Sequence, residues 1–388
     1  MQLSKLAKII EPTIARKLFM LAREYDDVIN FTIGDPDIPT PTGIVDAAYE
    51  AIKNGRTHYS ANLGIDQLRR AIAENIKKEH DCSYSDDEII ITIGAMEALY
   101  LSLMATVDSG DEVIIFAPYW KNYENMVRLC GGKAVIVKSC QKYGFIPQIK
   151  DVENAITDKT RVIIINSPNN PTGVIYEKSF LFRIIELAKE KSIIIISDEV
   201  YRSIIFTDEA PSSIIEFPDI KKNAILINSM SKAFAMTGWR VGYAAGDKEV
   251  IKAMMVFQQN MANCAPTPSQ YAAFEAVSHL KKYSNEVCTV FRKRRDVFME
   301  EINKISKLSI QKCNATFYSF IDVSETGMDG ERFAYELLEK EHVAVIPGIA
   351  FGKGYENYVR IAFTLDEEKI KIGINKLAEF IDKECETR

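Results

Sequence analysis

The sequence predicts an α/β protein with a large three-layer domain, built on a mostly parallel seven-stranded sheet, and a smaller α+β domain. Two observations lead to this prediction. Seven short apolar runs recur along the chain, and segments with the apolar spacing of amphipathic helices lie between them. Several runs are continuously apolar, which is typical of strands buried on both faces of a parallel sheet that is covered by helices.

The seven apolar runs are expected to form the strands of the large sheet. They lie at residues 88–93, 112–116, 134–138, 162–166, 193–197, 224–228 and 241–245. Helices are expected between them, for example over 96–106 (MEALYLSLMAT) and 178–191 (KSFLFRIIELAKEK), which have amphipathic spacing. We place the large, cofactor-binding domain at residues 45–285.

The character of the sequence changes after about residue 280. Residues 281–305 predict one long charged helix, and short strands are expected within 315–323, 343–348 and 358–363, before a last helix. The proline-rich stretch GDPDIPTPTG at 34–43 predicts an extended connection into the large domain. We expect residues 1–44 to fold back onto residues 286–388, which form the small C-terminal domain.

Composition narrows the class of protein. The 388 residues carry a formal net charge of −6, whereas a nucleic-acid partner usually requires a basic patch. No apolar run approaches the roughly 18 to 20 residues of a membrane span, and no signal peptide is evident. Seven scattered cysteines without a C-x-x-C pair are typical of a reducing compartment. We expect a soluble cytoplasmic protein that has no bound metal and contacts neither nucleic acid nor membrane.

Polar and aromatic residues follow the ends of five predicted strands. Ligands of an open parallel sheet bind beyond the carboxyl ends of its strands, so these residues are expected to meet at one site. They are Gly94, Ala95, Met96, Tyr119, Trp120, Asn170, Asp198, Tyr201, Ser229, Ser231 and Lys232. Together they describe a pocket for a flat, phosphorylated ring that contains nitrogen.

Several stretches resemble a known family. SPNNPTG at 167–173, SDEVY at 197–201 and SMSKAFAMTGWRVGY at 229–243 are similar, in order and spacing, to the class I and II aminotransferases of fold type I. Further similar stretches are FTIGDPDIPTP, HYSANLGIDQLRRAIA and NYVRIAF, so the resemblance covers nearly the whole chain. One short match is weak evidence, but six in register are specific. The resemblance implies pyridoxal 5′-phosphate as the cofactor and a homodimer with shared active sites.

The resemblance implies catalytic roles for three residues. Lys232 corresponds to the lysine that forms a Schiff base with the cofactor aldehyde and then transfers the substrate proton. Asp198 would pair with the protonated ring nitrogen and keep the ring an electron sink. Tyr201, together with Asn170, would hydrogen-bond the 3-oxygen of the ring. In isolation each residue has an ordinary structural alternative, such as a salt-bridged lysine or a helix-capping aspartate.

The other contacts follow from the same resemblance. Phosphate would be bound by a helix N-terminus, two hydroxyls and a guanidinium, provided by Gly94, Ala95, Met96, Ser229, Ser231 and Arg240. Tyr59 resembles the tyrosine that reaches the phosphate of the neighbouring subunit. Trp120 would stack on the ring, with Tyr119 as the adjacent alternative and Tyr123 on the same wall.

The substrate contacts involve the two ends of the chain. Arg360 resembles the arginine that binds the substrate α-carboxylate through a bidentate pair, and Asn170 is expected beside the substrate. Ile33 and Gly34 belong to the segment that closes over the substrate in this family. GIAFGKG at 348–354 has too few residues between its glycines for a phosphate loop, so we expect a turn there.

The activity implied is transfer of the amino group of an L-amino acid to a 2-oxo acid such as 2-oxoglutarate, by a ping-pong mechanism. The donor stays open between aspartate and aromatic or large neutral amino acids, because some aspartate-preferring relatives carry lysine in place of Met96. In CNATFY at 313–318, Asn314 or Thr316 is expected to alter the substrate wall. A C–S β-lyase acting on cystathionine or cysteine conjugates is the alternative enzyme, and a non-catalytic cofactor-binding regulator is a more remote one.

Overall fold

A computed structural model describes residues 2, 4, 6–8, 12–217 and 219–386 of the chain. Its large sheet has seven strands in the order β2-β8-β7-β6-β5-β3-β4. The strands are β2 (Ile89–Thr92), β3 (Glu112–Ala117), β4 (Lys133–Lys138), β5 (Thr160–Asn166), β6 (Ile194–Asp198), β7 (Ala224–Ser229) and β8 (Gly242–Ala245). Each strand lies at one of the seven apolar runs, so the predicted sheet is confirmed.

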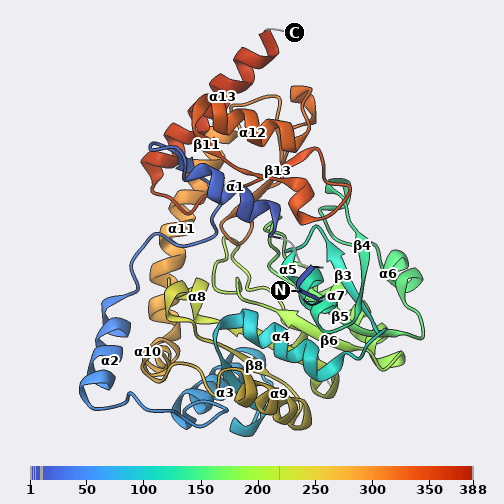
Figure 1. The fold of residues 1–388 in the computed structure, drawn as a ribbon, viewed down its shortest axis with the longest axis vertical. Helices are drawn as coiled ribbons and strands as arrows, with labels where there is room; N and C mark the ends of the chain where they lie inside the picture. The colour runs from blue at the N-terminus through green and yellow to red at the C-terminus, as the bar shows by residue number, and fades with distance from the viewer. Residues whose placement is uncertain (1, 3, 5, 9–11, 218, 387–388) are drawn as a thin grey trace.

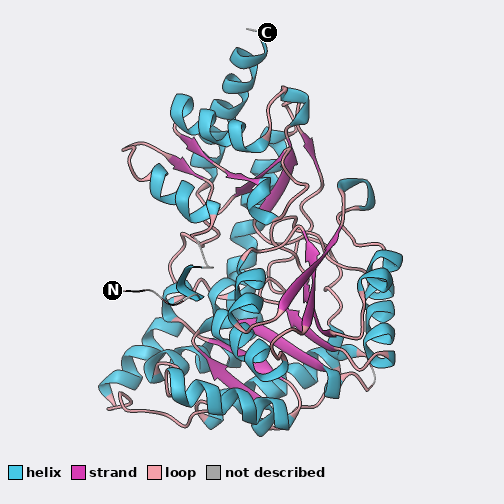
Figure 2. Cartoon of the chain, turned by 45° about the vertical axis from the view of Figure 1, so that its right-hand side comes forward, coloured by secondary structure: helices cyan, strands magenta, loops and turns pink. Residues whose placement is uncertain are grey.

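The large sheet is parallel except at β8, which runs antiparallel to both of its neighbours, β7 and β2. Helices cover both of its faces (Figures 1 and 2). They are α2 (Thr42–Lys53), α3 (Asp66–His80), α4 (Gly94–Thr106), α5 (Asn122–Leu129), α6 (Ile149–Ala155), α7 (Lys178–Glu190), α9 (Lys248–Met261) and α10 (Thr267–Ser278). Within the described ranges, no helix is long and apolar enough to cross a membrane.

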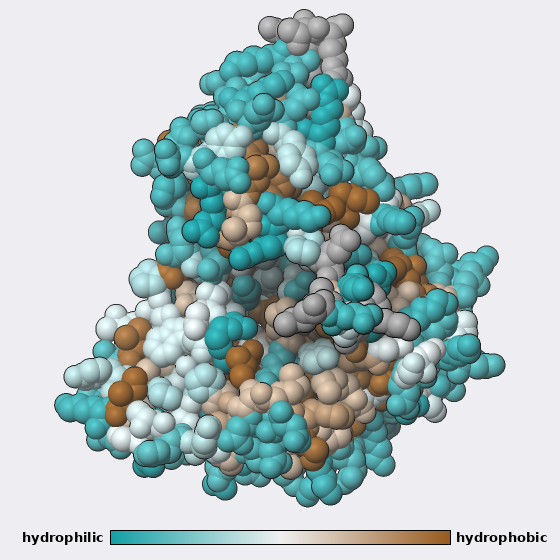
Figure 3. Space-filling view, viewed as in Figure 1, coloured by the Kyte–Doolittle hydropathy of each residue, from teal (hydrophilic) through white to brown (hydrophobic). Residues whose placement is uncertain are grey.

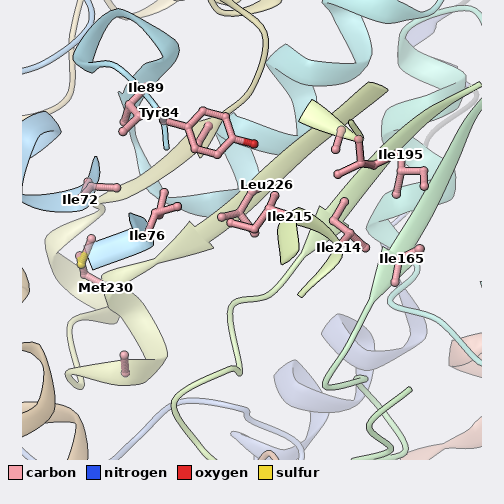
Figure 4. Close-up of a cluster of buried hydrophobic side chains, with 14 of the residues drawn as sticks. Ile72, Ile76, Tyr84, Ile89, Ile165, Ile195, Ile214, Ile215, Leu226 and Met230 are labelled. Atoms are coloured by element: carbon pink, nitrogen blue, oxygen red, sulfur yellow. The ribbon is translucent and has the colours of Figure 1, made fainter. Parts of the chain in front are cut away.

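The continuous apolar runs are explained by two hydrophobic clusters, one on each face of the large sheet. In β5, Ile163 and Ile165 belong to one cluster, whereas Ile164 belongs to the other. Figure 4 shows Ile165 among strand side chains of the first cluster, whose other side is lined by Ile72 and Ile76 of α3. Because successive side chains of a strand point to opposite faces, a strand covered on both sides needs apolar residues at every position.

A second, four-stranded sheet lies in the upper part of the molecule in Figure 1. Its strands, β12 (Ile346–Pro347), β13 (Tyr358–Ala362), β10 (Tyr318–Asp322) and β9 (Ser309–Ile310), all pair antiparallel. The predicted long helix is α11 (Leu280–Ile302), which runs upward to this sheet from the large one. The remaining helices, α12 (Gly330–Glu341) and α13 (Glu367–Glu386), pack against each other.

The N-terminal segment folds back onto the upper part of the molecule, as predicted. Its strand β1 (Ile29–Asn30) pairs in parallel with β11 (Val343–Ala344). Its helix α1 (Ile14–Ala22) contacts β11 and β12. The extended segment that follows β1 then runs down to α2, and so it passes over the carboxyl ends of the large sheet's parallel strands.

Candidate active site

A cavity of about 480 Å³ lies at the carboxyl ends of the parallel strands, between the large sheet and the N-terminal segment. In Figure 3 the surface is hollowed between the upper and lower parts of the molecule. Thirteen of the residues predicted to bind cofactor or substrate line this cavity, whereas Gly94, Tyr59 and Tyr119 do not. The thirteen are Ile33, Gly34, Ala95, Met96, Trp120, Asn170, Asp198, Tyr201, Ser229, Ser231, Lys232, Arg240 and Arg360.

Lys232 lies in α8 (Met230–Ala233), the single helical turn that follows β7. Its Nζ donates a 2.7 Å hydrogen bond to the backbone carbonyl of Gly34 and makes no ion pair with any described residue. Burial lowers the pKa of Lys232 to about 8, and the cationic Arg240 and Arg360 act in the same direction. A neutral, nucleophilic amine is therefore accessible close to neutral pH.

Asp198 is the last residue of β6 and is only 3% exposed. Its Oδ2 accepts a 2.6 Å hydrogen bond from the phenol of Tyr123, and its Oδ1 accepts a 3.3 Å bond from the backbone N–H of Val200. Burial raises the pKa of Asp198 to about 6, against the opposing effect of these hydrogen bonds. With no cation bonded to it in the described chain, this carboxylate suits a protonated ring nitrogen.

Arg240 and the hydroxyls of Ser229 and Ser231 form a second polar centre in the cavity. The guanidinium donates to the carbonyls of Thr237 at 2.8 Å and Ile93 at 3.4 Å, and no described carboxylate contacts it. The hydroxyls of Ser229 and Ser231 lie 2.9 Å apart. An arginine, two hydroxyls and the N-terminus of α4 provide the donors that a phosphate group needs.

Gly94 supports this arrangement although it does not line the cavity itself. It begins α4 with a φ of +75°, a conformation that side chains other than that of glycine rarely adopt. A Cβ atom at this position would lie 2.6 Å from Nη2 of Arg240. Glycine therefore lets the guanidinium approach the N-terminus of α4.

Arg360 of β13 forms a third polar centre. It donates to Oδ1 of Asn170 at 3.1 Å and to the carbonyl of Thr32 at 2.5 Å, while its Nε has no hydrogen-bond partner. The guanidinium carbon lies 4.4 Å from the ring centroid of Tyr318. Burial lowers the pKa of Arg360, and no described carboxylate pairs with it. A buried arginine of this kind is well placed to receive a carboxylate from a ligand.

Aromatic side chains complete the wall. Trp120 meets Tyr123 edge to face, with ring centroids 5.5 Å apart, whereas the adjacent Tyr119 is buried away from the cavity and donates to Glu124. Tyr201 and Tyr318 place their hydroxyl oxygens 3.1 Å apart. The sequence predicted only that Tyr123 lies on the cavity wall. The structure shows in addition that its phenol is hydrogen-bonded to Asp198.

One expectation for the small region needs correction. Neither Asn314 nor Thr316 lines the cavity; Tyr318 at the end of the same stretch does, because β10 points its side chain inward. The predicted turn at residues 348–354 begins with a short 3-10 helix over Gly348–Phe351, and its Ala350 and Phe351 lie on the cavity wall. A Cβ on Gly34 would lie only 1.7 Å from the hydroxyl of Tyr318, so glycine allows the N-terminal segment to pass this side chain.

Tyr59, predicted to contact the phosphate, lies on the surface of the protein. Its side chain is 83% exposed, and it does not line the cavity of its own chain. The role expected for Tyr59 concerns a neighbouring subunit, so it stays a prediction.

A profile of the family described as aminotransferase class I and II matches residues 26–377. The chain belongs to this family. The chain is 38% identical to the probable aspartate/prephenate aminotransferase of Aquifex aeolicus over 377 residues. This match covers 96% of this chain and 95% of that protein. Sequence resemblance and family membership therefore agree.

Solved structures match the aminotransferase over nearly its whole length. The aspartate aminotransferase from Thermus thermophilus with maleate superposes with a TM-score of 0.92 at 34% identity, covering 98% of this chain and 99% of that one. The aromatic aminotransferase from Pyrococcus horikoshii has a TM-score of 0.89 at 36% identity, covering 95% and 99%. The predicted fold and the prediction of an aminotransferase are confirmed, and the C–S β-lyase alternative is not favoured.

Proposed function

We propose that this aminotransferase binds pyridoxal 5′-phosphate in the cavity and moves the amino group of an L-amino acid to a 2-oxo acid such as 2-oxoglutarate. The observation that carries the proposal is a set of charged side chains that lack an opposite charge in the described chain. Lys232, Asp198, Arg240 and Arg360 complement an aldehyde, a ring nitrogen, a phosphate and an α-carboxylate, in that order.

The cofactor supplies an electron-withdrawing ring that stabilises negative charge on the substrate α-carbon. Lys232 would hold the cofactor through Nζ and, when that amine is free, would act as the base and acid that moves the substrate α-proton. Asp198 would pair with the ring nitrogen and keep it protonated. Arg360 fixes the substrate α-carboxylate, so that the bond to the α-proton faces Nζ.

The remaining wall residues position the ring and exclude water. Tyr201 and Asn170 are proposed to bind the 3-oxygen of the ring, and Trp120 to stack on its face. Phosphate is proposed to meet Arg240, the hydroxyls of Ser229 and Ser231, and the backbone N–H groups of Ala95 and Met96 at the start of α4. The segment with Ile33 and Gly34 covers the substrate, and its hydrogen bond from Lys232 supports this placement.

A homodimer with shared active sites is part of the proposal. The outer face of α2 exposes Val45, Tyr49 and Ile52, which recur at helical spacing and suit burial against a second copy. Tyr59 follows α2 and is exposed as well. A dimer formed through this face would bring Tyr59 to the phosphate of the partner subunit.

The compartment and the domain boundaries are also proposed. Six described cysteines are free, which supports a reducing cytoplasm: Cys82, Cys130, Cys140, Cys264, Cys288 and Cys313. The two separate sheets support a large domain at 45–285 and a small one formed by 286–388 with the N-terminal segment.

Single-turnover reactions test the function. The purified holoenzyme is mixed with one L-amino acid and no acceptor, and the 2-oxo acid released is quantified together with the change in cofactor absorbance. We expect about one 2-oxo acid per active site, and recovery of the starting spectrum when 2-oxoglutarate is added. Sustained release of pyruvate and ammonia without an acceptor would instead assign the enzyme to the β-lyases.

A further inference from the structure

One cation on the cavity wall has no role in the function proposed above. Of the charged wall residues, one is acidic and five are basic: Asp198, and Arg16, Lys121, Lys232, Arg240 and Arg360. Three of the basic residues serve the cofactor and the α-carboxylate, and Lys121 pairs with Glu124 at 2.5 Å. Arg16 makes no ion pair with any residue that the structure describes.

Arg16 is held at the cavity by the start of α1. Thr13 caps this helix, because its side chain accepts a 3.3 Å hydrogen bond from the backbone N–H of Arg16. Thr13, Ala15, Arg16 and Phe19 all line the cavity, so the first turn of α1 forms one side of the wall. The guanidinium carbon lies 5.1 Å from the ring centroid of Phe19, which supports the side chain and leaves the charged group exposed.

The charges in the cavity leave one anion unaccounted for. In the proposed function, phosphate meets Arg240 and the substrate α-carboxylate meets Arg360, while Asp198, the one acidic wall residue among the described residues, faces the ring nitrogen. A substrate whose side chain is cationic would be repelled by Arg16, and one whose side chain is neutral would leave its charge unused. A carboxylate is the group that matches a free guanidinium in charge and geometry.

Apolar side chains line the same cavity as Arg16, and they suit the methylene groups of such a side chain. Phe19, Ile33, Met96 and Phe351 contribute this surface. Position 96 in α4 carries an uncharged methionine. The cation that is free to bind a side-chain carboxylate is instead Arg16 in α1.

We propose that Arg16 is the specificity-determining residue that binds the side-chain carboxylate of a dicarboxylic substrate of the aspartate and glutamate class. The inference rests on the proposed function, because it places this carboxylate in the same cavity. A ping-pong enzyme receives donor and acceptor in one site, so Arg16 also serves a dicarboxylic 2-oxo acid such as 2-oxoglutarate.

The test compares three variants in separate half-reactions. Arg16→Met removes the charge and keeps the length, Arg16→Lys keeps the charge, and Lys17→Met removes the next charge of α1, which does not line the cavity. Single-turnover kcat/KM is measured with L-aspartate, L-glutamate and 2-oxoglutarate, and with L-phenylalanine as a donor without a second carboxylate. Cofactor content is measured for every variant, to establish that each one is folded.

For Arg16→Met we expect kcat/KM to fall roughly 10- to 100-fold with the dicarboxylates, the loss typical of a charge-assisted hydrogen bond, and to change less than about threefold with L-phenylalanine. Arg16→Lys should recover part of the loss, and Lys17→Met should match the wild type. Binding of maleate, an unreactive dicarboxylate, should weaken in Arg16→Met, whereas binding of 3-phenylpropionate should not.

Two results separate failure of this inference from failure of the proposed function. If the wild type transaminates but Arg16→Met treats dicarboxylates and L-phenylalanine alike, the inference is overturned and the proposed function stands. If the wild type completes no half-reaction with any donor, the proposed function itself fails.

Discussion

The phenol of Tyr123 donates a 2.6 Å hydrogen bond to Oδ2 of Asp198, and both side chains are buried. The bond matters because burial raises the pKa of Asp198, which is about 6 with this hydrogen bond in place. Tyr123 lowers this pKa, and so keeps the carboxylate ionised at neutral pH. Tyr123 is therefore a positioning residue for the ring-nitrogen partner.

Replacement of Tyr123 by phenylalanine should weaken the enzyme most at acidic pH. Loss of one hydrogen bond to a charged group is expected to raise the pKa of Asp198 by about one unit, and so to lower activity about threefold at pH 6.5 and nearly tenfold at pH 5. The pH profile of kcat/KM should show its acidic limb displaced upward. Tyr119→Phe, a buried neighbour that does not line the cavity, is the control, and an unmoved acidic limb would contradict the role of Tyr123.

Asp198→Asn should separate stability from activity. The folded-state pKa of about 6 lies above the ordinary aspartate value of 3.8, so ionisation opposes folding. The protonated carboxyl group of Asp198 favours the folded state. This contribution to stability is complete below pH 3.8 and is lost as the pH rises through 6. At pH 7 the free energy of unfolding of the cofactor-free variant, measured in urea, should therefore exceed that of the wild type by about 1 kcal/mol. Its turnover should fall at least about 100-fold, because the ring loses its ionic partner; a near-normal rate would refute that assignment.

Covalent attachment of the cofactor should depend on pH through Lys232. Its pKa of about 8 makes the neutral amine increase with pH up to that value and level off above it. Attachment to cofactor-free protein, followed by absorbance, should accelerate nearly tenfold from pH 6 to pH 7 and plateau above about pH 9. Borohydride should then trap the cofactor on Lys232 in the wild type. A trapped adduct on another lysine in Lys232→Ala would show that a different residue is the anchor.

Tyr59 should act across subunits. Tyr59→Phe is expected to weaken cofactor affinity roughly tenfold in the homodimer, by loss of a hydrogen bond to a charged phosphate. In a mixed dimer of Tyr59→Phe and Lys232→Ala subunits, the site that keeps its lysine would receive tyrosine from the other subunit. Its affinity, measured by fluorescence titration, should return to the wild-type value. Affinity that stays weak in the mixed dimer would place Tyr59 in its own subunit's site.

The strands of the large sheet and most of the residues that line the cavity were predictable, because buried strands have continuous apolar runs and the ends of parallel strands lie at one edge of the sheet. Continuous apolar runs, such as the one that contains Ile163, Ile164 and Ile165, indicated strands covered on both faces, and their side chains do alternate between two clusters. Carboxyl ends of parallel strands converge, so residues that follow them, such as Asp198 and Lys232, were expected together. The antiparallel direction of β8 was not specified, because an apolar run has no direction.

Contacts between segments that are distant in the sequence could not be predicted from the sequence alone. The sequence predicted that residues 1–44 fold back onto the small domain, but not that the first turn of α1 brings Arg16 to the cavity. That placement depends on the pairing of β1 with β11 and on the packing of α1 against β12. Tyr318 was missed for the same reason, since alternation along β10 does not say which face meets the cavity.

The reversal of the chain at β8 has a mechanical consequence. Lys232 and Arg240 both lie on the connection that leaves β7 and returns along β8, so one continuous piece of backbone carries the two residues that are proposed to anchor the cofactor. A rigid shift of this connection displaces both anchors by the same vector. The distance between the two residues therefore stays constant when the connection moves as one unit. Groups on other strands and on the small sheet can move relative to both residues.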